Sequence, residues 1–480
     1  MPKDERMLID GKWRPAQKGA TFDVRNPADG RLVGRVACGS RADARRAIEA
    51  AHKAGRDWAE TTPRERGKLL AAAAEIIRRR ADALARLVTL ENGKPLLQSM
   101  AEVNGSVENF TWYAEEARRA YGRIVPTARS DKRWLVIKRP VGVVASISPW
   151  NFPILLQARK VAPALAAGCT VVMRPASYTP LVAVELARCL VDAGIPKGVV
   201  NLVTGPAREI AEEFLQNPLC RKITFTGSTE VGRGLMRGVA DQVKRLSLEL
   251  GGHAPFIVFP DADIQQAAEM AADGKFRNTG QTCISPNRFY IHADVYDDFL
   301  RRFVAIAKKM KVGHGLTQGV EVGPMIDRAG FEKCMVHIED AVAKGAKVLC
   351  GGKRLTGGAY DKGFFLAPTI LAPAREDMLC MTEETFGPVA PIATFHKEDE
   401  AIEKANNTIY GLASYAFSRD IKTVMRAAER LEAGIIGIND ALPAVPECPF
   451  GGVKQSGVGR EGGSEGLDAF LETKFVSVVL

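Results

Sequence analysis

From residue 141 onward, short runs rich in β-branched residues alternate with longer helical stretches, and this alternation limits the possible folds more than any other feature. The strand-sized runs lie at 143–147, 170–173, 199–203 and 223–226, and the helical stretches between them lie at 154–167, 180–193 and 207–216. Strands that alternate with helices predict a parallel sheet whose faces are covered by the helices. The chain is therefore expected to be an α/β protein.

A second alternation begins near Gly251-Gly252 and continues to about residue 440, with strands expected at 288–292 and 434–438. Because 480 residues exceed what one hydrophobic core usually organises, a second α/β domain is expected here. Ahead of both, 42–58 and 62–92 have helical periodicity. The second of these helices is predicted to begin at a capping box, Thr62-Pro63-Arg64-Glu65, and to stop at Asn92-Gly93.

Two segments fit neither domain. Residues 133–138 and 475–480 alternate in hydropathy like exposed strands. Strands of this kind present free edges, so they are expected to pair with each other or with another chain.

Charge and composition exclude several classes of protein. The net charge is +10, but lysines and arginines are spread over helical faces, as in Arg78-Arg79-Arg80, and no basic stripe with interleaved aromatics occurs. This pattern favours a solvated surface over nucleic-acid binding and leaves a mild preference for anionic substrates open. No apolar stretch is long enough for a membrane span, and the charged N-terminus shows no secretory signal, so a cytoplasmic location is expected.

Cysteine and histidine spacing argues against a metal site. The nine cysteines are scattered and never form CxxC, and the six histidines show no HxxxH pattern. Reduced thiols and no bound metal are expected.

Two residues have the chemistry of a nucleophile and a base. Cys283, in Asn278-Thr-Gly-Gln-Thr-Cys283, follows small and polar residues that would let its side chain face a cleft, although a cysteine taken alone is more often an inert buried residue. Glu249, between leucines and ahead of Gly251-Gly252, is costly to bury, and desolvation would raise its pKa into the range of a general base. Alternatively, Glu249 could only form a salt bridge at the end of a strand.

Two further segments follow predicted strands. Asn151, between Pro149 and Pro153, could present its amide N–H to a developing oxyanion, or the hexapeptide 148–153 could be only a rigid turn. In Phe225-Thr-Gly-Ser-Thr-Glu-Val-Gly232, a strand leads through glycine into a helix, which suits a phosphate-cradling turn, although it lacks the GxGxxG pattern.

Taken together and in this order, the segments resemble the aldehyde dehydrogenase superfamily. The resemblance runs from about Ile9 to the C-terminus, and within it the succinate-semialdehyde dehydrogenases are most similar. Its motifs are PWNFP at 149–153, FTGSTxVG at 225–232, LELGG at 248–252, GQTC at 280–283, EETFGP at 383–388 and PFGGVKQSG at 449–457.

The resemblance implies a Rossmann-like NAD(P)-binding domain over about 1–119 and 141–251 and a catalytic domain over 252–448. It also implies a small β oligomerisation element over 120–140 and 449–480, and hence a homodimer or homotetramer. Cys283 would be the nucleophile, Asn151 and the Cys283 N–H the oxyanion hole, and Glu249 the base that activates water. The residues that fall where the family holds its dinucleotide are Trp150, Asn151, Arg174, Pro175, Ala176, Ser177, Gly227, Ser228, Leu250, Glu384 and Phe386. No metal is implied.

Departures from the family pattern bear on the cofactor. Arg174 stands where lysine is usual, and Ser177 stands where NAD-preferring members often carry glutamate. A guanidinium can grip a phosphate, and serine does not repel one. NAD or NADP is therefore expected, with NADP favoured by these two residues. His253 replaces a frequent lysine and has no functional explanation.

The substrate is predicted to be a small anionic aldehyde, first of all succinate semialdehyde. Arg159 and Arg277 stand where that subfamily is thought to hold the distal carboxylate, although either could be a structural ion-pair partner. Ile284 in place of a second cysteine and the segment 443–446, where that subfamily often offers a serine, keep other substrates open. These are glutarate semialdehyde, sulfolactaldehyde, glycolaldehyde and lactaldehyde.

Two rival functions are compatible with the same fold. An acylating enzyme that transfers the acyl group to CoA must keep water from the thioester and usually lacks a base like Glu249. A non-catalytic member of the fold would be expected to lose Cys283, Asn151 or Glu249, and all three are present.

Overall fold

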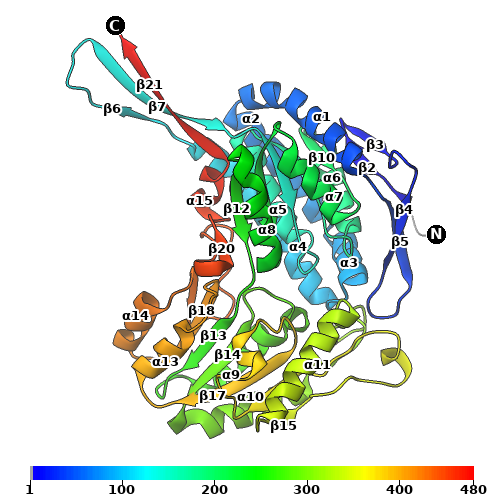
Figure 1. Ribbon diagram of the computed structural model, residues 1–480, viewed down its shortest axis with the longest axis vertical. Coiled ribbons are helices and arrows are strands. Elements are labelled where there is room, and N and C mark those ends of the chain that lie inside the picture. Colours follow the sequence, from blue (N-terminus) through cyan, green and yellow to red (C-terminus); the bar gives the residue numbers. More distant parts are fainter. Residues whose placement is uncertain (1–3) are drawn as a thin grey trace.

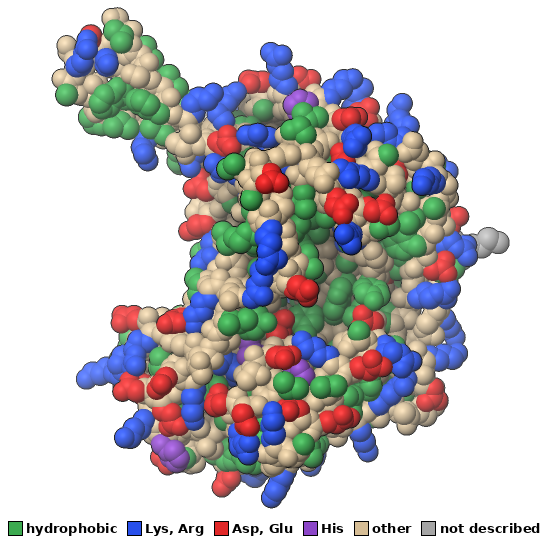
Figure 2. Space-filling view, viewed as in Figure 1, with side chains coloured by type: hydrophobic (Ala, Val, Ile, Leu, Met, Phe, Trp, Pro, Cys, Tyr) green, Lys and Arg blue, Asp and Glu red, His purple; other side chains and the backbone are tan. Residues whose placement is uncertain are grey.

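The computed structural model describes residues 4–480, so Met1–Lys3 of the charged N-terminus lie outside the described residues. Two α/β units lie one above the other, and a narrow β arm extends from the upper unit (Figure 1). Figure 2 shows hydrophobic side chains gathered at the centre of this face, between the two units. Among the described residues, no helix combines the length and the apolar character that crossing a membrane requires.

The upper unit is built on an eight-stranded sheet with strand order β20-β12-β11-β8-β9-β10-β2-β3. Its five central strands, β12 to β10, are mutually parallel, as the alternation predicted. The strands are β2 (Met7–Ile9), β3 (Lys12–Arg14), β8 (Val143–Ile147), β9 (Thr170–Arg174), β10 (Val200–Leu202), β11 (Cys220–Thr226), β12 (Arg245–Glu249) and β20 (Gly457–Val458). A three-stranded sheet of β1 (Asp4–Glu5), β4 (Thr21–Arg25) and β5 (Leu32–Ala37) flanks it.

Eight helices accompany this sheet: α1 (Arg41–Glu60), α2 (Pro63–Arg79), α3 (Ala81–Asn92), α4 (Leu96–Glu116), α5 (Leu155–Ala167), α6 (Leu181–Asp192), α7 (Ala207–Gln216) and α8 (Thr229–Val239). The predicted capping box is present, since Glu65 N donates to Thr62 Oγ1 and Thr62 N to Glu65 Oε2. The prediction of one helix over 62–92 was wrong. Arg80 leaves the helical conformation (φ −98°, ψ 8°), and the chain turns there so that Leu84, Ala85 and Val88 of α3 reach the core.

The lower unit contains a seven-stranded sheet with strand order β15-β16-β17-β14-β13-β18-β19. The strands are β13 (Ala254–Val258), β14 (Pro286–His292), β15 (Lys347–Cys350), β16 (Thr369–Ala372), β17 (Val389–Phe395), β18 (Ala413–Phe417) and β19 (Ile435–Ile438). Six α-helices lie in this part of the chain: α9 (Ile264–Phe276), α10 (Tyr296–Lys309), α11 (Arg328–Ala343), α12 (Leu379–Thr382), α13 (Glu398–Asn406) and α14 (Ile421–Arg430). The expected second α/β unit is therefore present and begins after Glu249.

The arm is a three-stranded sheet in the order β21-β7-β6 (Figure 1). Its strands are β6 (Arg123–Val125), β7 (Lys132–Pro140) and β21 (Leu471–Val479), so the two segments that fitted neither domain pair with each other. Of the segment 449–480 that was grouped with this element, only the last part joins it. Gly457–Val458 pairs with β12 in the upper sheet, and α15 (Gly463–Asp468) connects the two.

Strand register explains where a site can form. Ile147 is paired with Arg174 and with Phe225, and Glu249 is paired with Thr226, so β8, β9, β11 and β12 end at one edge of the upper sheet. Residues that follow these strands are brought together although they are far apart in the chain. This edge faces the loop before β14 in the lower unit, since Asn151 and Gln281 are hydrogen-bonded across it.

Candidate active site

Asn151 follows β8 and is held against the loop that carries Cys283. Its side-chain nitrogen donates to the carbonyl of Gln281 (3.2 Å). Asn278 Nδ2 completes the contact by donating to the carbonyls of Asn151 (2.9 Å) and Gln281 (3.1 Å). The amide of Asn151 thus points toward the residues just before the cysteine, as an oxyanion donor there would require.

A buried ion pair holds the Asn151 loop from behind. Lys94 Nζ donates to Glu102 Oε2 (2.6 Å) and to the carbonyl of Asn151 (2.5 Å), and both side chains are fully buried. Glu102 Oε1 accepts from the backbone N–H groups of Ile154 (3.0 Å) and Leu155 (3.3 Å), where α5 begins. The pair therefore fixes both ends of the loop.

Cys283 lies on the turn between the 3₁₀ segment η3 (Arg277–Gly280) and β14. Two non-glycine residues of this segment have left-handed backbones, Asn278 (φ 49°) and Thr279 (φ 59°). A left-handed β-branched residue is strained and persists only where its surroundings impose it. After the cysteine, the hydroxyl of Tyr415 donates to the carbonyl of Ile284 (2.6 Å) and holds the turn against β18.

The sulfur is a protonated thiol in this environment. Burial raises the pKa of Cys283 to about 12, and the nearby Glu249 carboxylate adds to the rise, while Arg159 opposes it. A thiol with this pKa needs a proton acceptor before it can attack a carbonyl.

Glu249 ends β12 and is buried, and its Oε2 has no hydrogen-bond partner within the described part of the chain. Burial raises its pKa well above the usual value, and the neighbouring Glu461 raises it further. This direction is the one that desolvation of a carboxylate is expected to give. Gly451 leaves room for the carboxylate, because a Cβ at that position would lie 2.6 Å from Glu249 Oε1.

Lys160 links Glu461, the acidic neighbour of Glu249, to strand β11. Its ammonium donates to Glu461 and to Thr226 Oγ1 (2.5 Å). The charge of Lys160, together with that of Arg159, favours the ionised form of Glu249 and partly offsets burial.

A hollow of about 270 Å³ brings most of the predicted nicotinamide-side residues together with the cysteine. Trp150 and Phe386 meet edge to face, with ring centroids 5.7 Å apart. Glu384 Oε1 accepts from the backbone N–H of Gly252 (3.0 Å), and burial raises the pKa of Glu384 to about 7. Of the predicted residues, the hollow is lined by Trp150, Asn151, Gly227, Ser228, Leu250, Cys283, Glu384 and Phe386.

A second hollow of about 720 Å³ adjoins the first and shares Pro149, Thr226 and Gly227 with it. Arg174 and Ala176 line it, whereas Pro175 is buried and Ser177 is exposed beside it. Arg174 donates to Ser177 Oγ (3.3 Å) and to the carbonyl of Gly205 (3.1 Å), and its buried Nε has no partner. Burial lowers the pKa of Arg174 to about 10.

These two hollows fit a dinucleotide. α8 begins between them with Ser228 as its N-cap, and Ser228 Oγ accepts from the N–H of Val231 (3.4 Å). The start of the helix offers positive potential to a pyrophosphate. Within residues 4–480, no three His, Cys, Asp or Glu side chains converge in a way that could hold a metal ion.

The two predicted substrate arginines both lie in the electrostatic environment of Cys283. Arg159, on α5, is buried with its guanidinium 4.3 Å from the ring centroid of Phe450. Arg277, after α9, is half-buried and lies 5.3 Å from the ring of Phe152. The charge of Arg159 influences Glu249, Cys283 and Arg277, so both arginines belong to the same electrostatic environment.

His253 is buried, and its ring lies 6.2 Å from the ring of Tyr410, centroid to centroid. Burial, and then the charge of Arg288, lowers its pKa well below the usual value, so the ring is neutral. Nothing in the structure assigns it a role.

Several residues of the site were not found from the sequence. Lys94, Glu102, Asn278 and Glu461 were given no role. The one available signal was a charged residue, Glu102, at a helical position between buried neighbours on α4. Its partner lies on a different element, so sequence pattern alone could not supply it.

Comparison with known proteins agrees with this geometry. The sequence profile described as "Aldehyde dehydrogenase family" matches residues 13–476. The chain is 48% identical over 472 residues to glutarate-semialdehyde dehydrogenase of Pseudomonas aeruginosa, covering 98% of this chain and 97% of the relative. It is 46% identical over 477 residues to the NADP(+) succinate-semialdehyde dehydrogenase of Escherichia coli, covering 99% and 98%. A crystal structure of succinate-semialdehyde dehydrogenase from Burkholderia pseudomallei superposes with a TM-score of 0.97 at 46% identity, covering 99% of this chain and 98% of that one.

Proposed function

Because the chain belongs to the aldehyde dehydrogenase family and is an NAD(P)-dependent enzyme of small aldehydes, we propose that its substrate is anionic, with succinate semialdehyde as first candidate. The product is the carboxylic acid, formed through a thioester on Cys283. One observation carries the proposal. The guanidiniums of Arg159 and Arg277 both interact electrostatically with the half-buried thiol of Cys283.

The first step is addition of Cys283 to the aldehyde. As the C–S bond forms, the thiol proton passes to a base. The base is the carboxylate of Glu249 in its ionised form, which acts electrostatically on the thiol and whose own pKa is raised. The oxygen of the former carbonyl gains negative charge, and the Asn151 amide and the Cys283 N–H donate to it. A bound dinucleotide supplies the oxidant that takes the hydride from this carbon.

The second step is hydrolysis of the thioester. Glu249 first releases the thiol proton to solvent and then accepts a proton from water as the C–O bond forms. The C–S bond breaks as this proton passes to the sulfur, which returns the Cys283 thiol. The overall balance is aldehyde, water and oxidised dinucleotide to acid, reduced dinucleotide and a proton. The burial of Glu249 beside Cys283 favours hydrolysis over transfer to CoA.

The anion preference rests on unused hydrogen-bonding capacity at the arginines. Neither Arg159 nor Arg277 forms an ion pair within 4.0 Å among residues 4–480; each instead stacks on a phenylalanine ring. A carboxylate that accepts from such a guanidinium forms a charge-assisted hydrogen bond. Glutarate semialdehyde, sulfolactaldehyde and the neutral glycolaldehyde and lactaldehyde are the alternatives.

NADP is the proposed cofactor, because Arg174 projects an unpartnered Nε at the wall of the larger hollow and Ser177 carries no charge. Glu384 would hold the nicotinamide ribose and Trp150 and Phe386 would border the ring.

We also propose that the arm joins subunits into a dimer or tetramer. Its outer strands leave apolar side chains in water, with exposed fractions of 74% for Ile124 and 61% for Phe475. Covering such edges by a second copy removes the hazard of unpaired strands.

The substrate test compares kcat/KM for succinate semialdehyde, glutarate semialdehyde, sulfolactaldehyde and propionaldehyde with each dinucleotide. In Arg277→Leu, KM for the anionic substrate should rise about 10- to 150-fold, since a hydrogen bond to a charged group contributes roughly 1.5–3 kcal/mol. KM for propionaldehyde should stay within about twofold, and Arg277→Lys should lie between the two. Equal losses for anionic and neutral aldehydes would show that Arg277 does not anchor the substrate.

A further inference from the structure

A third hollow, of about 520 Å³, lies at the opposite edge of the upper sheet, where β8, β9 and β11 begin. Val143 and Thr170 are the first residues of β8 and β9 and line it, together with Arg221 of β11. The active site follows the other ends of these strands. Because β9 has five residues, the two edges are separated by roughly 17 Å at ~3.3 Å per residue.

The lining of this hollow carries charge of one sign. His52 and Arg56 come from α1, Arg139 from the end of β7 and Arg221 from β11, and no aspartate or glutamate lines it. Glu60 bonds Arg139 (3.3 Å), but Arg56 and Arg221 have no ion pair among residues 4–480. A concave surface lined by one sign of charge concentrates counter-ions.

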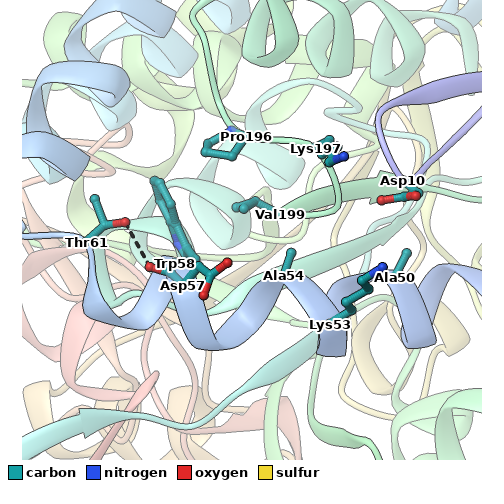
Figure 3. A pocket seen from close by; sticks show the side chains of 10 residues that line it. All are labelled: Asp10, Ala50, Lys53, Ala54, Asp57, Trp58, Thr61, Pro196, Lys197 and Val199. Atoms are coloured by element: carbon teal, nitrogen blue, oxygen red, sulfur yellow. Dashed lines mark hydrogen bonds between the residues drawn. The ribbon is translucent and has the colours of Figure 1, made fainter.

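A neighbouring hollow gives a useful contrast. Figure 3 shows it along α1, between the helix and the segment around Pro196 and Val199, with Asp10 and Lys197 at one end. It is lined by two lysines and two aspartates, Lys53, Lys197, Asp10 and Asp57, so its charges balance. The third hollow lacks this compensation.

Glycines create the space. Gly55, Gly142 and Gly168 line the hollow without side chains, and the latter two have left-handed backbones (φ 119° and 91°) that other residues rarely adopt. A Cβ on Gly142 would lie 3.2 Å from Cγ of Arg221, so the arginine side chain passes directly over this glycine.

A buried hydroxyl in the same lining lacks a partner. Thr170 is 1% exposed, and its Oγ1 makes no hydrogen bond. Oγ1 and Cγ2 of Thr170 both lie 3.8 Å from where a Cβ on Gly55 would stand, so this side chain packs against α1, the helix that contributes His52 and Arg56. Buried hydroxyls are normally hydrogen-bonded, and one without a partner calls for a bound group.

We propose that this hollow is a second, non-catalytic site that binds a small phosphate-bearing molecule. Guanidiniums bind phosphate oxygens in pairs, and a threonine hydroxyl donates to them. The volume exceeds that of a single phosphate and lies in the range of sites for small metabolites. Arg56 and Arg221 would hold the phosphate, with Thr170 at the inner wall.

Calorimetry on the full-length enzyme tests the proposal, with inorganic pyrophosphate as the probe. Saturating NADP⁺ is present so that Arg174 is occupied. The wild type should bind one pyrophosphate per subunit, and Arg56→Gln/Arg221→Gln should weaken binding at least tenfold. Thr170→Val should weaken it severalfold, because it keeps the shape and removes the hydroxyl. Arg31→Gln/Arg328→Gln is the matched control, since it removes the same charge at exposed positions and should bind like the wild type.

The double variant should also keep the wild-type kcat/KM when no pyrophosphate is present. Absence of binding to the wild type, or an unchanged Kd in Arg56→Gln/Arg221→Gln, would overturn the proposal. The proposal would also be overturned if the wild type bound no pyrophosphate and the double variant changed the mass of the oligomer, because the two arginines would then contact a second subunit.

Discussion

Replacing Lys94 with methionine tests whether the buried pair behind the Asn151 loop serves catalysis or only stability. Methionine keeps most of the apolar stem and removes the ammonium that reaches Glu102 (2.6 Å) and the Asn151 carbonyl (2.5 Å). Glu102 then stays buried without its partner. Breaking a fully buried pair by removing one member costs roughly 3–5 kcal/mol, so the variant should be clearly less stable.

The effect on catalysis should be smaller than the loss of an oxyanion donor, which lowers kcat about 10²- to 10³-fold. Lys94 acts through the loop and does not touch the substrate, so we expect kcat to fall about 10- to 100-fold, or ~1.4–2.7 kcal/mol, with KM within about twofold. Hydrolysis of p-nitrophenyl acetate, which needs the same thiol and oxyanion hole but no dinucleotide, should fall in parallel. NADP⁺ binding, measured by calorimetry, should be retained.

A double variant separates the two roles. Lys94→Met/Glu102→Leu removes both buried charges, which should restore much of the stability, because hydrophobic replacement of a buried pair is often neutral. It should not restore kcat, since the carbonyl of Asn151 keeps only its bond from Asn278 and the N–H of Ile154 still lacks its carboxylate partner. Lys222→Met is the matched control: Lys222 is buried and donates to Ser247 (2.6 Å), away from the loop. Wild-type kcat in Lys94→Met at reduced stability would refute the positioning role.

Three further predictions concern other parts of the molecule. Deacylation needs ionised Glu249, whose pKa is raised first by burial and then by Glu461, so activity is lost as the pH falls through that pKa. In Glu461→Gln the acid limb of the kcat–pH profile should therefore move to lower pH. A limb that does not move would contradict this coupling. Ser177→Glu places a carboxylate beside Arg174, whose guanidinium now donates to the Ser177 hydroxyl (3.3 Å). This variant should lower kcat/KM for NADP⁺ at least tenfold and leave kcat/KM for NAD⁺ unchanged. Parallel steady-state assays with both dinucleotides would check this. Phe475→Lys puts charge on an exposed apolar position of β21 and should lower the oligomer mass in light scattering; an unchanged mass would mean that this face of the arm joins no subunits.

The secondary structure could be predicted largely from local pattern. Strands such as 143–147 and helices such as 207–216 agree with β8 and α7, because side-chain periodicity and caps act within a few residues. The break at Arg80 was missed, since the need to bring α3 onto the core comes from distant elements and not from neighbours in sequence. The segments 133–138 and 475–480 could have paired with each other or with another chain, and only the folded structure decided that they pair with each other.

For the site, the sequence by itself determined which chemical groups are available: a thiol at 283, an amide at 151, a carboxylate at 249 and arginines at 159, 174 and 277. The tertiary structure decided which groups meet and in what ionisation state. Lys94 reaches Asn151 because α3 ends beside the loop after β8. The pKa values of Cys283 and Glu249 are raised because the meeting of two sheets removes both groups from much of their contact with water. Burial and contact between distant residues are properties of packing, and for that reason no local pattern specifies them.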